Sequence, residues 1–176
     1  DEAMGTAVTI QRMVFGNAGC HSGAGVGFTR DPTDGENRIW VDFLANAQGE
    51  DVVAGQRNAH GHEVLAQTAP DAWNELQATA VQLEQAFQDM QDFEFTVQDG
   101  ALYMLQTRSG KRTPLAAARI ALDLLDEGLI DAETARERTH ALRDDDLATL
   151  RLVTQDAHKP GTGPATSLAE AMSACN

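Results

Sequence analysis

Four polar side chains in the stretch DFEFTVQDGALYMLQTRSGKRT (92–113) could together bind phosphate. Asp92 and Glu94 alternate with phenylalanines, and Gln106 and Arg108 follow an apolar run. Mg²⁺ is usually held by one or two carboxylates together with substrate phosphates. Arg108 offers a planar fork of donors to a phosphate oxygen, and the neutral amide of Gln106 can bridge without adding charge. The alternative is a solvated face with a cross-strand ion pair, which contributes about 0–1 kcal/mol.

The elements that must position these side chains are two strands joined at Asp99-Gly100, a dipeptide typical of hairpin turns. A two-residue loop would set Glu94 opposite Leu105 and mix polar with apolar residues on both faces. A three-residue loop, 98–100 with Gly100 left-handed, separates them, and a slip of one residue reverses every side chain, so this register is favoured. It predicts that all four polar residues share one face. On the opposite face it predicts Phe93, Phe95, Val97, Ala101, Tyr103 and Leu105.

Composition narrows the class of partner. The 176 residues are 42% apolar, which indicates a globular chain of one domain or two small lobes. The net charge of −14, with 27 acidic and 13 basic residues, argues against nucleic acid or an anionic membrane as a partner. An anionic small ligand would need a metal ion and the local basic cluster of Arg108, Lys111 and Arg112.

The remaining composition signals concern location. No apolar run approaches the roughly 18 residues of a membrane helix, and no signal peptide opens the chain. Cys20 and Cys175 are far apart, which predicts no disulfide framework and favours the cytosol. The chain begins close to a strand without an initiator methionine, so we expect a segment of a longer protein.

The pattern along the chain predicts an α+β fold. We expect strands at 6–16, 23–30 and 37–44, a loop at 45–58, and a long helix at 69–90 whose apolar residues repeat every three or four positions. Helices at 114–128 and 131–146 follow the hairpin, and 155–176 has the composition of a linker. Gly23, Gly25 and Gly27 indicate either a β-bulge or a close approach to the backbone, and the second would suit a strand lying under a ligand.

Several stretches together carry a family resemblance. These are MGTAVTIQRMVFGN, SGAGVGFTRDPTDGE, NAQGEDVVAG, QDFEFTVQDGALYMLQTRSGKRT and DLLDEGLI. They resemble pyruvate, phosphate dikinases, in the carboxy-terminal half of the ATP-grasp nucleotide-binding domain, over roughly residues 4–140. The broader pattern of EF followed by LQTR is shared with phosphoenolpyruvate synthase and rifampicin phosphotransferase, which remain alternatives, as does a non-catalytic nucleotide-binding module.

The resemblance implies a domain plan and a function. It implies an ATP-grasp lobe with a mainly antiparallel sheet at 1–113, a helical segment at 114–154, and a linker at 155–176 toward a phosphohistidine domain. Such enzymes move phosphoryl groups from ATP through a histidine to pyruvate, forming phosphoenolpyruvate. The partners implied are ATP, an amino-terminal lobe, the phosphohistidine domain, a pyruvate-binding barrel and, for the full-length enzyme, a second copy.

The resemblance also assigns roles to residues. It implies that Glu94, Gln106, Arg108 and Glu50 bind ATP, and that Asp92, Glu94 and Gln106 hold Mg²⁺. It assigns no catalytic residue to this chain, and none of the five histidines stands in the family's phosphohistidine context. One departure lies at Val41-Asp42, where the family often has Gly-Glu, so that the carboxylate is one methylene shorter. Without its partner lobe the chain is expected to be inactive.

Overall fold

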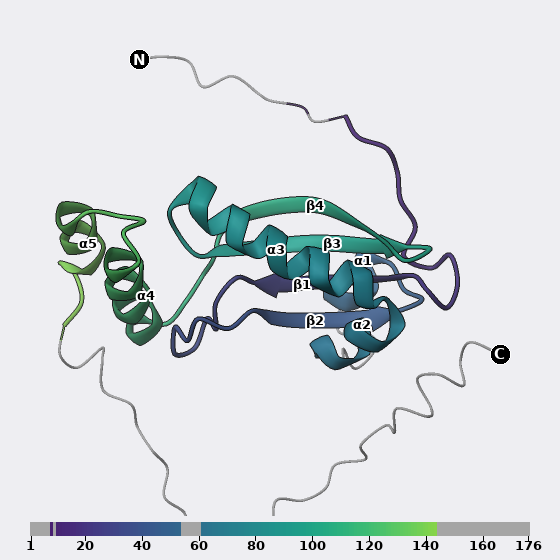
Figure 1. The fold of residues 1–176 in the computed structure, drawn as a ribbon, viewed down its shortest axis with the longest axis horizontal. Coiled ribbons are helices and arrows are strands. Elements are labelled where there is room, and N and C mark those ends of the chain that lie inside the picture. Colours follow the sequence, from purple (N-terminus) through teal and green to yellow (C-terminus); the bar gives the residue numbers. More distant parts are fainter. Residues whose placement is uncertain (1–7, 9, 54–60, 144–176) are drawn as a thin grey trace, which may run out of the picture.

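The computed structural model describes residues 8, 10–53 and 61–143. Its centre is a four-stranded antiparallel sheet in the order β2-β1-β3-β4. The strands are β1 (Gly23–Phe28), β2 (Trp40–Ala45), β3 (Gln91–Gln98) and β4 (Ala101–Ser109). Helices α2 (His62–Thr68) and α3 (Pro70–Phe87) contact the strands, and α3 crosses the sheet on one face (Figure 1). The predicted α+β class is confirmed.

The main core lies between that face and the two helices. Alternate residues of β2 and β3 supply it from the sheet, and Leu65 and Leu76 supply it from the helices. The sheet contributes Val41, Phe43, Phe93, Phe95 and Val97. The long helix was predicted at 69–90, but it ends at Phe87 because Gln88 adopts a left-handed conformation with φ 52°. The alternate residues of the strands and the residues spaced three or four apart in α3 thus pack together in one apolar layer.

The glycines of β1 make room for aromatic rings in this core. Gly25 pairs with Phe95 and Gly27 pairs with Phe93, and a Cβ atom at either glycine would overlap the ring of its partner. A Cβ atom at Gly23 would meet the ring of Phe43. The expectation of close backbone approach is therefore confirmed, whereas the expectation of a ligand over this strand stays a prediction. What approaches them is the phenylalanine layer on the helix-covered side.

Two other expectations need correction. Residues 10–15, predicted as part of a strand at 6–16, form no strand, and Ile10 and Met13 are exposed. The alternation is present, but among the described residues no neighbouring strand pairs with this segment; its Phe15 amide donates to the Gln98 side chain instead. The predicted loop at 45–58 contains a short helix, α1 (Gly49–Val53). Asp51 stabilises its start by accepting a hydrogen bond from the Gln48 amide.

A second apolar cluster joins the sheet to the last two helices, α4 (Pro114–Asp126) and α5 (Ala132–Thr139). The Thr113 side chain caps α4 by accepting from the Ala116 amide, and Gly128, at φ 72°, follows its end, as predicted. Helix α5 is shorter than the predicted 131–146. The predicted linker at 155–176 lies outside the described residues. No described helix is long and apolar enough to cross a membrane.

Candidate functional site

The β3–β4 turn has two residues rather than the predicted three. Gln98 pairs with Ala101, which leaves Asp99 and Gly100 as the loop. Both have positive φ, 53° and 82°, as a type I′ turn requires. The left-handed Gly100 is confirmed, whereas the loop length was wrong because Asp99 shares that conformation.

A β-bulge restores the arrangement that the longer loop was expected to give. Phe95 pairs with Met104, but Glu94 pairs with Gln106, so Leu105 is an extra residue on β4. Beyond the bulge, Asp92 pairs with Arg108. Cross-strand partners share a face, so Asp92, Glu94, Gln106 and Arg108 lie on one face of the sheet, as predicted.

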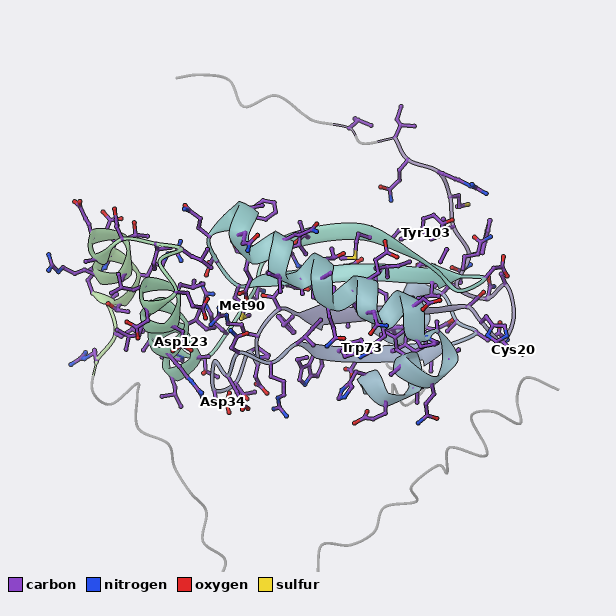
Figure 2. All side chains as sticks on the ribbon, viewed as in Figure 1. Cys20, Asp34, Trp73, Met90, Tyr103 and Asp123 are labelled. Atoms are coloured by element: carbon purple, nitrogen blue, oxygen red, sulfur yellow. The ribbon has the colours of Figure 1, made fainter. Side chains whose placement is uncertain are left out.

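The two-residue turn and the bulge also change which apolar residues of β4 face the core, compared with the prediction. Between the turn and the bulge, Leu102 and Met104 pack against the main core. Tyr103 pairs with Thr96, and therefore lies on the same face as Glu94 rather than in the core. Figure 2 shows Tyr103 toward the turn end of the sheet, whereas Met90 and Asp123 lie at the opposite end, near α4.

Asp92 and Arg108 form the best-defined contact of this polar face. Arg108 Nε donates to Asp92 Oδ2 at 2.8 Å, and the Arg108 side chain is 60% exposed while that of Asp92 is 14% exposed. The hydrogen bond to Asp92, and then its negative charge, raise the pKa of Arg108 above its ordinary value. One donor of the guanidinium is thereby fixed, and the exposed remainder of the fork is available to an oxyanion.

The same face continues across β1 and β2. Val26 pairs with Glu94 on one side and with Asp42 on the other, so that Asp42, Val26, Glu94 and Gln106 form one row across the sheet. Burial raises the pKa of Asp42. Asp42 was noted in the sequence only as a departure from the family pattern. Its alternation against Val41 and Phe43 was the signal that it belongs to this face.

The next row combines the ion pair with aromatic rings. Phe28 pairs with Trp40 on one side and with Asp92 on the other, and Asp92 pairs with Arg108. The rings of Phe28 and Trp40 lie 5.7 Å apart in a tilted arrangement. An apolar surface therefore adjoins the polar groups on this side of the sheet.

Glu50 and the expected basic cluster have different surroundings from the carboxylates of the hairpin. Glu50 is exposed in the first turn of α1, a helix that contacts β1, β2 and β3, so it comes from a different element than the hairpin residues. In the expected basic cluster, Arg112 is already engaged, since it makes two hydrogen bonds to the Asp89 carboxylate at 2.7 and 2.8 Å. Lys111 is exposed, and Arg108 keeps exposed guanidinium donors beside its ion pair with Asp92.

The donor set can be compared with the requirements of a divalent cation. Among the described residues, no group of three or more His, Cys, Asp or Glu side chains could hold a metal ion alone. Asp92 and Glu94 supply two carboxylates on one face, and Gln106 supplies an amide oxygen. This set suits Mg²⁺, which usually completes its coordination with water and substrate phosphates.

Comparison with known proteins identifies the family. The profile described as pyruvate phosphate dikinase, AMP/ATP-binding domain, matches residues 1–71 and 59–128. The chain belongs to this family. A pyruvate, phosphate dikinase from Clostridium symbiosum is 52% identical over 143 residues, 81% of this chain and 16% of that protein. A chloroplastic one from Flaveria pringlei is 48% identical over 155 residues, 88% of this chain and 16% of that protein.

The dikinase family is the first of the families that the sequence motifs left open, and the family expectation is confirmed. The chain spans about 16% of the length of these two relatives. It therefore corresponds to part of the nucleotide-binding domain of a pyruvate, phosphate dikinase.

Proposed function

We propose that the polar face of the hairpin binds the phosphates of Mg-ATP. The observation that carries this proposal is the cross-strand alignment of two carboxylates, an amide and a guanidinium on one face, in a chain of the AMP/ATP-binding family. In this proposal Arg108 donates to phosphate oxygens, while Asp92, Glu94 and Gln106 hold Mg²⁺. Glu50 contributes to the site from α1.

The proposed role of the residues is positioning and charge neutralisation. Phosphoryl transfer requires little covalent chemistry from the protein around the nucleotide. Bound Mg²⁺ would neutralise phosphate charge, which is needed because the chain carries a net charge of −14. The exposed fork of Arg108 would then orient the terminal phosphates, with its position fixed by Asp92.

In the longer enzyme we propose that this lobe clamps ATP together with an amino-terminal lobe. Phosphoryl groups would then pass to a histidine of another domain and on to pyruvate, forming phosphoenolpyruvate. We further propose a cytosolic location and a homodimeric full-length enzyme. Two relatives, from Flaveria pringlei and Flaveria trinervia, are described as chloroplastic.

Trp40 offers a direct test of nucleotide binding. It lies in the row of Phe28 and Asp92, whereas Trp73, the other tryptophan, is on α3 and stacks on His62 at 5.1 Å. In a Trp73→Phe background, Mg-ATP should change the emission of Trp40 with a saturable dependence on concentration. Arg108→Ala should weaken the response, while Arg136→Ala, at an exposed position of α5, should not.

The two arginine variants decide the outcome. An emission change that is equal in Arg108→Ala and Arg136→Ala would contradict the proposed face, since both variants lose one positive charge. We also expect the isolated chain to show no steady ATP hydrolysis. A nucleotide held by one lobe remains in water, where each charge contact is weakened by the high dielectric constant. Turnover that persists through repeated purification would refute this expectation.

A further inference from the structure

Arg30, just beyond the end of β1, is a fully buried charge at the junction of the sheet with α3 and α4. Its side chain is 0% exposed. Its Nε and Nη2 atoms donate to the Glu84 carboxylate of α3 at 2.9 to 3.1 Å. The same Nη2 donates to Glu127, which follows α4, at 2.7 Å. One guanidinium thus joins three elements that are distant in the sequence.

The geometry around Arg30 is held from several sides. Thr29 Oγ1 donates to Glu84 at 2.6 Å, and Asn37 donates to Glu127 at 3.2 Å. Burial by itself would lower the pKa of Arg30, but the hydrogen bonds and charges of Glu84 and Glu127 outweigh it and raise that pKa. The guanidinium is therefore charged, and moving α4 away would take one of its two hydrogen-bonded carboxylates with it.

The sequence of helix α4 is poorly suited to forming a stable helix by itself. Its last turn carries acidic residues and no basic ones, namely Asp123 and Asp126, with Glu127 following directly. Negative charges at a helix C-terminus oppose the helix dipole. Arg30 supplies the missing positive charge from the sheet side, with Nη1 3.7 Å from Asp123 Oδ2, and Arg119 adds a second contact to Asp123 at 3.8 Å.

Apolar and polar contacts extend the junction to α5. Phe28 and Met90, from the sheet side, belong to the apolar cluster formed with α4 and α5. The Gln88 side chain donates to the Leu129 carbonyl at 2.9 Å, and Arg138 of α5 donates to the Gln88 carbonyl at 2.8 Å. The sheet end, α4 and α5 are thus joined by apolar packing and by two side-chain hydrogen bonds as well as by Arg30.

We propose that Arg30 locks α4 and α5 to the nucleotide-binding sheet, so that these helices move with the sheet as one body rather than acting as a hinge. Arg30 is in this sense a positioning residue of the lobe. The inference rests on the buried ion-pair junction and does not depend on which ligand the polar face binds.

Neighbouring acidic residues provide a matched pair of variants. Glu127→Gln removes a charge that contacts Arg30, whereas Asp126→Asn removes an exposed charge from the same turn. Both changes remove a negative charge that interacts unfavourably with the dipole of α4, so both should be favourable in this respect. If only the interaction with the helix dipole mattered, the α4 amides would exchange their hydrogens slightly more slowly in both variants. If the ion pair with Arg30 holds α4 in place, the α4 amides should instead exchange faster in Glu127→Gln.

The test is amide hydrogen exchange on the 176-residue chain. In the unchanged protein, α4 and β3 amides should exchange through openings of similar free energy, as one cooperative unit. Glu127→Gln should accelerate exchange in α4 by about tenfold, alone or together with β3, and Asp126→Asn should not accelerate it. Equal exchange in the two variants would overturn the proposal, as would α4 amides that exchange far faster than β3 amides in the unchanged protein.

Discussion

Arg108 Nε donates to Asp92 Oδ2 at 2.8 Å across the β3–β4 ladder, one residue pair from the start of β3. The contact fixes the guanidinium on the sheet face before any ligand arrives. A preorganised donor loses less conformational entropy when it binds than a free side chain does. Asp92 is therefore expected to support phosphate binding even though it is itself negative.

Asp92→Ala should lower the affinity for Mg-ATP by about tenfold, because it releases Arg108 and removes a proposed metal ligand. The direction of the change in affinity is informative. If only long-range charge mattered, the less negative variant would bind the anionic nucleotide more tightly, not less tightly. Asp71→Ala, at an exposed position in the first turn of α3, gives the same change in net charge. Calorimetric titration of both variants checks the expectation, and equal affinities would contradict it.

Glu94→Gln should have opposite effects with and without Mg²⁺. With Mg²⁺ present, the loss of a carboxylate ligand should weaken ATP binding by about tenfold or more. Without Mg²⁺, the same change removes repulsion between Glu94 and the triphosphate, so ATP should bind at least as well as before. The measurement is the ratio of ATP affinities with Mg²⁺ and with a chelator. A ratio unchanged by the substitution would argue against a metal at Glu94.

Gly25→Ala should destabilise the fold by about 1–3 kcal/mol, because the added methyl group would overlap the Phe95 ring in a filled core. Gly49→Ala is the control, since a Cβ atom there meets nothing within 4 Å. Urea unfolding of the two variants measures the difference in free energy. If Phe95→Leu restored stability to Gly25→Ala, the overlap with the ring would be established as the cause.

The turn after β1 should contribute a pH-dependent part of the stability. Burial alone would raise the pKa of Asp31, but hydrogen bonds from Thr33 and an ion pair with Arg38 at 3.0 Å lower it instead. Because the folded-state pKa is depressed, this stabilisation is fully present above the unfolded-state pKa of about 3.9. It is lost as the pH falls through the lower, folded-state value.

Asp31→Asn should therefore destabilise the chain at neutral pH and flatten the decline of stability below about pH 4. Unfolding free energies measured across that range, with Asp34→Asn for comparison, give the test. An equally steep decline in Asp31→Asn and in the unchanged chain would show that other carboxyl groups are responsible.

The hairpin shows how far sequence patterns reach. Asp99-Gly100 specified the turn, and the alternation around Phe93 and Phe95 specified which face is polar. The bulge at Leu105 left no local signal, because it is favoured only once Leu102 and Met104 pack into the core. The predicted face was therefore right for Asp92, Glu94, Gln106 and Arg108 but wrong for Tyr103.

Other features were missed because they depend on tertiary contacts. Helices α1 and α2 are five and seven residues long, too short for a clear apolar period. In FTRDPTDGE nothing distinguishes Arg30 from a surface arginine, because its partners Glu84 and Glu127 lie 54 and 97 residues further along the chain. Long elements with strong periodicity, such as α3 and α4, were predictable.

The most direct test of the nucleotide-binding face is paramagnetic broadening of backbone amide signals by Mn²⁺-ATP, with Mn²⁺ in place of Mg²⁺. The hairpin site predicts the strongest broadening in residues 92–96 of β3 and 105–108 of β4, and its loss in Arg108→Ala. Mn²⁺ without ATP controls for the general attraction of a chain with net charge −14. Broadening that is strongest around α3 or α4, or that is the same with and without ATP, would contradict the account.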